Sequence, residues 1–125
     1  MAPRPVLEIT VESLDNALAA ERAGADRIEL CAELMHGGIT PSFGAMRAIH
    51  DEIEIPVFPI VRPRKGDFLY SEKEFTAMKH TIDSVRDLAA LLKITKSRSS
   101  SVWRTNTYDS SSESIWKSLP VRSAA

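Results

Sequence analysis

The sequence predicts an α/β fold in which parallel strands alternate with helices. Three observations predict it: short apolar runs alternate with amphipathic segments up to residue 92, capping residues precede the amphipathic segments, and the connections are short. Short connections of this kind favour βα units whose consecutive strands are parallel. We therefore expect the order βαβαβα over residues 1–92.

The first strand is expected at residues 6–11 and the first helix at residues 14–23. Ser13 stands at the N-cap position, where its hydroxyl can accept a hydrogen bond from a free amide of the first helical turn. Gly24 follows the helix, and glycine commonly ends helices because it adopts the left-handed conformation without strain.

The second strand is expected at residues 27–31, followed by a loop over residues 32–39. Thr40 then fits the N-cap of a second helix, because Pro41 after it suits the first helical turn. This helix should run to about residue 53, with His50 on its surface.

The third strand is expected at residues 57–61, where a nearly continuous apolar run is typical of a parallel strand covered on both faces. A polar loop follows it, with two arginines, Gly66 and Asp67. Ser71 and Glu74 have the spacing of a capping box, which predicts a third helix from there to about Leu92.

The composition changes sharply near residue 92. Residues 1–92 hold 10 Lys and Arg against 15 Asp and Glu, a net charge of 10 − 15 = −5. Residues 93–125 hold 6 basic and 2 acidic residues, a net charge of +4, and 10 serines. We expect residues 1–92 to form the folded segment and the serine-rich, basic, low-complexity segment 93–125 to be disordered.

The whole-chain composition excludes several classes of protein. The net charge of −1 gives no general attraction to nucleic acid, and no recognition motif accompanies the basic residues of the last segment. No apolar run is long enough to span a membrane, and the single cysteine excludes an internal disulfide. We therefore expect a cytoplasmic protein that binds neither nucleic acid nor membranes.

Four separated motifs, in this order and spacing, resemble the CutC copper homeostasis family. They are Leu-Glu-Ile at residues 7–9, Gly-Ala-Asp-Arg-Ile-Glu-Leu-Cys at 24–31, Gly-Gly-Ile-Thr-Pro-Ser at 37–42 and Val-Arg-Pro-Arg-Lys-Gly-Asp-Phe-Leu-Tyr-Ser at 61–71. The resemblance covers about residues 6–88. It implies a TIM-type (β/α)8 barrel, of which this chain holds the first three βα units, and a role in copper binding and copper homeostasis.

Three of eight strands cannot close a barrel. We therefore expect a truncated form whose open sheet edges favour homo-oligomers, because an edge strand presents unpaired backbone groups to other chains.

Cys31 is the candidate copper ligand, since a thiolate is a soft ligand that suits Cu(I). The resemblance implies cysteines near the ends of the first two strands, but Thr10 occupies the first of these positions. Copper would then need Met35, His36 or a second chain as a further ligand. The alternative is that Cys31 is a small buried apolar residue without a role in metal binding.

Glu8 and Glu29 are candidate catalytic carboxylates, because they occupy similar positions in the first two strands. If both face the barrel mouth, they form a pair opposite Arg62 and Arg64, which could bind a carboxylate or phosphate group. Asp67 of the same loop is a further candidate residue of this substrate- or anion-binding site. The alternative is an ion network with a structural role only, in which the arginines pair with these carboxylates or with Asp67.

Thr40 and Ser42 could also contribute to an anion site at a helix start, although ordinary capping explains them as well. Two function classes thus stay open. One is a copper-binding protein. The other is a TIM-barrel enzyme of unknown reaction that acts on a small anionic or sugar-like substrate and is inactive if the barrel is incomplete.

Overall fold

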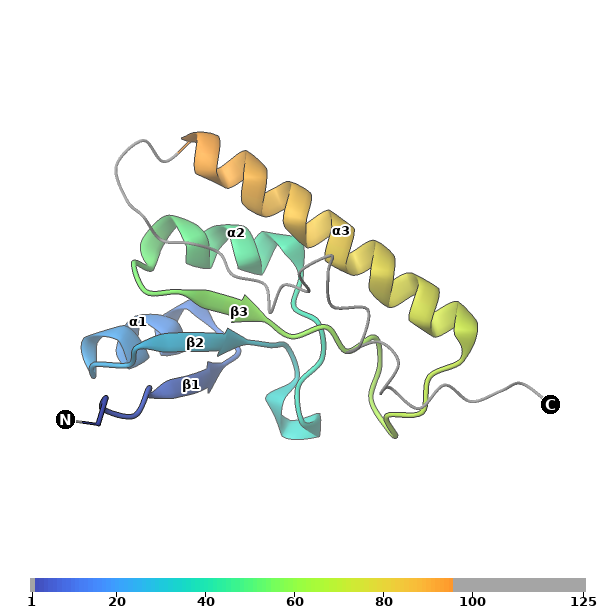
Figure 1. The fold of residues 1–125 in the computed structure, drawn as a ribbon, viewed down its shortest axis with the longest axis horizontal. Helices are drawn as coiled ribbons and strands as arrows, with labels where there is room; N and C mark the ends of the chain where they lie inside the picture. Colours follow the sequence, from blue (N-terminus) through green and yellow to red (C-terminus); the bar gives the residue numbers. More distant parts are fainter. Residues whose placement is uncertain (1, 96–125) are drawn as a thin grey trace.

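The structure, a computed structural model, describes residues 2–95, and their side chains up to residue 89. Three strands form one parallel sheet in the order β1-β2-β3, which confirms the predicted α/β fold with three βα units. The elements, drawn in Figure 1, are β1 (Glu8–Val11), α1 (Leu14–Arg22), β2 (Arg27–Leu30), the 3-10 helix η1 (Leu34–His36), α2 (Phe43–Glu52), β3 (Val57–Pro59) and α3 (Glu72–Thr95).

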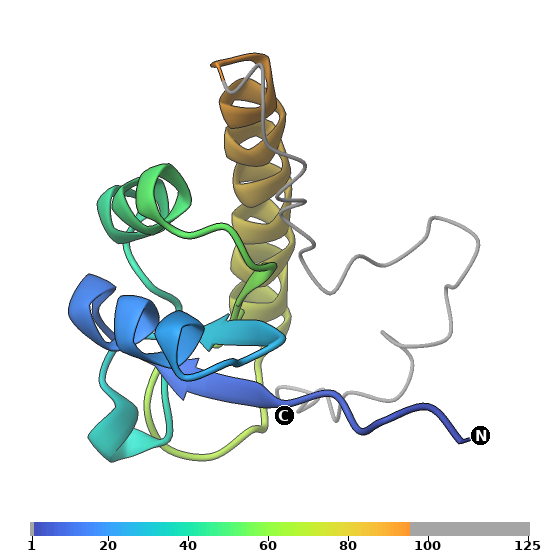
Figure 2. The same cartoon turned by 90° about the vertical axis from the view of Figure 1, so that its left-hand side faces the viewer.

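The three α-helices lie on one side of the sheet, and the hydrophobic core fills the space between the two layers (Figure 2). Alternate residues of each strand face this core, because side chains along a strand point to opposite faces in turn. Burial of these side chains is the main contribution to the stability of the fold. The strands contribute Val11, Ile28, Leu30 and Val57, and the helices contribute Ala17, Ala20, Met46, Ile49, Val85 and Ala89.

The opposite face of the sheet is polar at its centre and bears no helix within residues 2–95. Glu8, Thr10 and Arg27 on this face are exposed, and Glu29 and Phe58 are half-buried. The expectation that the third strand is covered on both faces is therefore wrong for these residues. The observed face is the one that a closed barrel would turn inward, as three βα units of a barrel predict.

Three helix starts were predicted from capping residues, and two of these predictions are correct. Ser13 caps α1, where its Oγ accepts a hydrogen bond from the Asn16 amide at 3.1 Å. Ser71 and Glu74 form the capping box at α3: the Glu74 amide donates to Ser71 Oγ (3.2 Å) and the Ser71 amide donates to Glu74 Oε2 (2.7 Å). At α2 the N-cap is Ser42 and not Thr40, since Ser42 Oγ accepts a hydrogen bond from the Ala45 amide at 3.1 Å.

Further details differ from the sequence-based expectations, among them the start of β1 at Glu8, two residues later than predicted. His50 is 2% exposed, although we expected it on the surface. β3 ends at Pro59, two residues earlier than predicted, and α3 continues to Thr95, three residues beyond Leu92. The predicted disorder of residues 93–125 is wrong for residues 93–95, which belong to α3, and residues 96–125 lie outside the described part of the chain. In the described part, no helix is long and apolar enough to cross a membrane.

Candidate functional site

The carboxyl ends of the three strands meet at one edge of the sheet, and the loops that follow β2 and β3 lie together there (Figure 1). The loop after β2 is closed by a pair of backbone hydrogen bonds between Ala32 and Ile39, at 2.9 and 2.8 Å. Its two glycines, Gly37 and Gly38, have φ values of +86° and +85°, which side-chain-bearing residues rarely adopt. The loop therefore has a defined shape over the sheet edge.

Cys31 lies beneath this loop, one residue beyond the end of β2. Its side chain is 2% exposed, and a Cβ atom at Gly38 would lie only 3.0 Å from Cys31 Cβ and 3.2 Å from Cys31 Sγ. Glycine at position 38 thus allows the loop to pack directly on the thiol. Burial raises the pKa of the Cys31 thiol, and the nearby carboxylates of Glu12 and Glu29 raise it further. The thiol is therefore protonated at neutral pH.

The other candidate copper ligands in the loop are oriented differently. Met35 is 91% exposed, and the His36 ring is half exposed, with Nδ1 3.6 Å from the Glu33 carboxylate. Among the described residues, no group of three or more His, Cys, Asp or Glu side chains could hold a metal ion. Cys31 is thus placed at the predicted edge of the sheet, but without a preformed set of ligands around it.

Glu8 and Glu29 do not form the predicted pair. In the parallel register Glu8 lies opposite Arg27, with which it forms an ion pair, and Glu29 lies opposite Thr10. The Thr10 hydroxyl donates to Glu29 Oε2 at 2.8 Å. The two carboxylates therefore belong to successive rows of the uncovered face, and Glu8 lies at the amino end of β1, away from the loops.

Arg62 is held in the loop region by backbone carbonyls. Its side chain is 6% exposed, with Nη1 donating to the carbonyls of His36 and Gly38 and Nη2 donating to the carbonyl of Gly66, each at 2.9 Å. The Phe68 ring stacks on the guanidinium, with its centroid 4.7 Å from the central carbon. Arg62 thus joins the loop after β2 to the loop after β3, and it forms no ion pair with Glu8 or Glu29.

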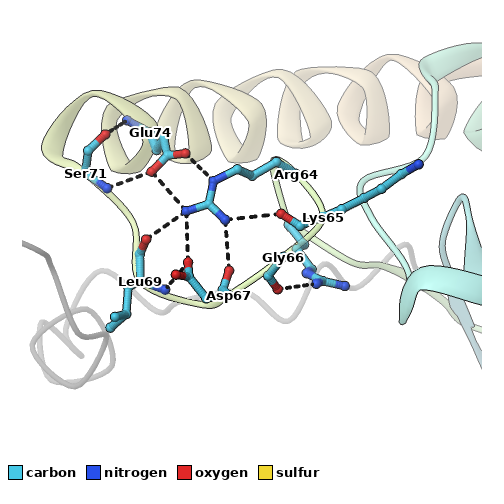
Figure 3. A network of polar contacts seen from close by, with 8 residues as sticks. Arg64, Lys65, Gly66, Asp67, Leu69, Ser71 and Glu74 are labelled. Carbon is cyan, nitrogen blue, oxygen red and sulfur yellow. Dashed lines mark hydrogen bonds and ion pairs between the residues drawn. The ribbon is translucent and has the colours of Figure 1, made fainter.

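Arg64 has a different environment, shown in Figure 3. Its guanidinium forms ion pairs with Glu74 and Asp67 and also donates to the carbonyl of Leu69 at 2.8 Å. The Arg64 guanidinium and the Ser71 amide lower the pKa of Glu74 to about 2. This arrangement confirms the alternative in which Arg64 pairs internally, and it fixes the loop after β3 to the start of α3.

Thr40 also connects the two loops. Its hydroxyl accepts a hydrogen bond from the Arg62 amide at 2.9 Å, and its amide donates to the Arg62 carbonyl at 3.0 Å. The Thr40 hydroxyl is therefore engaged with the backbone of Arg62 and not with the start of α2. Ser42 is engaged as the cap of that helix, so neither hydroxyl is positioned for an anion.

Three residues near the site escaped the sequence analysis. Glu12 accepts a hydrogen bond from the Leu34 amide at 2.8 Å, Lys65 forms an ion pair with Glu33, and Phe68 stacks on Arg62. These contacts join residues far apart in the chain, and no local pattern marks them. The sequence offers one signal for Phe68: an aromatic residue in a polar loop is expected to be unusually exposed.

Comparison with known proteins gives consistent results. The model of the CutC family matches residues 5–97. Proteins named CutC from Mesorhizobium japonicum and Serratia proteamaculans are 55% and 54% identical to the chain over 84 and 82 residues, covering 67% and 66% of it. The matched region spans 33% and 32% of the length of these relatives, about one third.

A solved structure is similar as well. The crystal structure of a protein from Streptococcus agalactiae, described as a candidate copper homeostasis protein CutC, superimposes with a TM-score of 0.60 at 31% sequence identity. The superposition covers 67% of this chain and 42% of that protein. It supports the assignment of β1, β2 and β3 as strands of a TIM-type barrel.

Proposed function

The chain belongs to the CutC family, and from this premise we propose that it takes part in copper homeostasis by binding Cu(I) through Cys31. The observation that supports the proposal is the position of the thiol at the carboxyl end of β2, the edge where α/β barrels bind their ligands. Copper homeostasis is also the role for which the solved relative from Streptococcus agalactiae is named.

Binding by this chain is expected to be weak. Cu(I) binds the thiolate, so the proton must leave a thiol whose pKa is raised by its surroundings. The loop that packs on Cys31 must also open to admit the ion and a second ligand, because Gly38 lies directly against Sγ. Met35, His36 or Cys31 of a second copy would complete the coordination.

Replacing Cys31 by serine should lower the affinity for Cu(I) at least about ten-fold, because the only thiol of the chain is lost. Competition with a Cu(I) chelator under anaerobic, reducing conditions measures this. Met35→Leu is the matched control for the thioether of the same loop. The affinity of the parent should rise with pH, since more thiolate forms as pH approaches the raised pKa. Equal affinities of the parent and Cys31→Ser would refute the proposal.

Thr10→Cys extends this experiment. Thr10 lies opposite Glu29, which precedes Cys31 by two residues and therefore points to the same face of the sheet. A cysteine at position 10 would thus be a diagonal neighbour of Cys31. We expect this variant to bind Cu(I) more tightly than the parent. The cytoplasmic location and the truncation expected from the sequence stay predictions.

A second candidate function is an enzyme that acts on a small anionic or sugar-like substrate at the same edge of the sheet. The observation in its favour is Arg62, a buried cation that has no carboxylate partner among residues 2–95. Glu29, half-buried and hydrogen-bonded to Thr10, is then the candidate acid or base. Turnover of small phosphorylated or carboxylated sugars by the parent, and its loss in Glu29→Gln, would support this function over copper binding.

A further inference from the structure

The buried Arg62 guanidinium has hydrogen-bond donors that the protein leaves unused. A guanidinium carries five N–H donors, two on each Nη and one on Nε. Two of them on Nη1 donate to the carbonyls of His36 and Gly38, and one on Nη2 donates to the carbonyl of Gly66. Nε is buried and has no hydrogen-bond partner among residues 2–95. The donors that remain are therefore on Nε and Nη2, which are neighbouring nitrogens of the same plane.

The positive charge of Arg62 also has no counter-charge among the described residues. Burial of a charged group such as a guanidinium is unfavourable unless an opposite charge accompanies it. Three carbonyl dipoles and the Phe68 ring surround Arg62, but none of the described carboxylates forms an ion pair with it. A negative charge is thus the missing partner.

Arg64, two residues along the same loop, provides an internal comparison. All three of its nitrogens have partners, and two of the partners are the carboxylates of Asp67 and Glu74 (Figure 3). The loop and the first turn of α3 therefore supply a full set of acceptors and counter-charges to Arg64 and not to Arg62. This difference separates the two arginines, which the sequence alone presents as equivalent.

We propose that Arg62 binds a small oxyanion, the carboxylate or phosphate group of a small molecule, through its Nε and Nη2 donors. Two oxygens of such a group match the parallel donors of a guanidinium edge in a bidentate hydrogen-bonded pair. Thr40 and the three carbonyls hold the arginine in place before the anion arrives, which reduces the conformational entropy lost on binding. Phe68, 63% exposed, lies over the same guanidinium.

The site goes beyond copper binding and does not depend on it, because none of its donors belongs to Cys31. It also differs from catalysis: an anion that binds without being transformed would support the site and leave the enzymatic function unsupported. The experiment below contains neither copper nor a turnover assay, so its failure is distinguishable from the failure of either function.

The test is an NMR titration of the full chain labelled with ¹⁵N in its arginine side chains. Phosphate and acetate are added separately at constant ionic strength, with chloride as the control anion. We expect a saturable shift of the Arg62 Nε–H resonance with at least one oxyanion and no saturable shift with chloride. The phosphate and acetate arms show which of the two groups the site prefers.

Two matched variants accompany the titration, with binding measured by calorimetry. Arg62→Lys keeps the charge but removes the planar pair of donors, so the affinity for the preferred oxyanion should fall at least about ten-fold. Arg64→Lys should keep the affinity of the parent. Three results would each overturn the proposal. They are an equal loss of oxyanion affinity in both variants, an unchanged affinity in Arg62→Lys, and an Arg62 Nε–H resonance that no oxyanion perturbs. The Arg62 Nε–H resonance of the parent protein tests the proposal even if Arg62→Lys fails to fold.

Discussion

Replacing Ile28 by aspartate is expected to abolish the cooperative unfolding transition of the chain. Ile28 is completely buried at the centre of β2, the middle strand, and belongs to the core between the sheet and the helices. A carboxylate there would lose its hydration without gaining a partner, at a cost of several kcal/mol. Small domains have total free energies of unfolding of about 5–15 kcal/mol, so the energetic cost of this single substitution is comparable to the total stability.

Thermal unfolding followed by circular dichroism measures this effect. Glu29→Gln is the matched control, because residue 29 is the next residue of β2 and points to the uncovered face. This variant weakens only the hydrogen bond from Thr10 and should unfold nearly as the parent does. A parent-like transition in Ile28→Asp would mean that β2 is not the central buried strand.

The second large effect expected is self-association through the edges of the sheet. β1 and β3 are the outer strands of the sheet formed by residues 2–95, so each has one side without a hydrogen-bonded neighbour there. Such edges pair with other chains unless they are covered or charged. Light scattering after size-exclusion chromatography should therefore give a mass above 13.8 kDa that rises with protein concentration.

Thr10→Pro should reduce this association. The amides of Arg27 and Cys31 donate to the carbonyls of Leu7 and Val11. The backbone groups of Thr10, an alternate residue of β1, therefore point to the free side of this strand. Proline removes the N–H of this residue while leaving the pairing with β2 intact. Thr10→Val is the control, since it loses the hydroxyl and keeps the N–H. A concentration-independent monomer of the parent would contradict the prediction.

Most of the fold could be predicted from local patterns. The apolar runs located all three strands, and the capping residues Ser13 and Ser71 located the starts of α1 and α3, because caps act within one helical turn. The start of α2 was misplaced because the choice between Thr40 and Ser42 depends on a contact 22 residues away: the Thr40 hydroxyl bonds to the Arg62 backbone. The burial of His50 likewise depends on packing that its own helix does not determine.

The candidate site could be predicted only in outline. The sequence located Cys31 and Arg62 at the carboxyl ends of strands, and in the structure Cys31 lies one residue beyond β2 and Arg62 three residues beyond β3. It could not determine the register, which places Glu29 opposite Thr10 and separates it from Glu8. Nor could it distinguish Arg62 from Arg64, because the loop geometry decides which arginine meets carboxylates and which meets carbonyls.

The most direct test of the site is the reaction rate of its thiol. Cys31 is the only cysteine of the chain, so a chromogenic disulfide reagent reports on it alone. Because Gly38 packs on the buried thiol, whose pKa is raised, the native protein should react on the order of 100-fold more slowly than the protein unfolded in urea. A native rate equal to the rate in urea would show that the loop does not cover Cys31 and would contradict the account of the site.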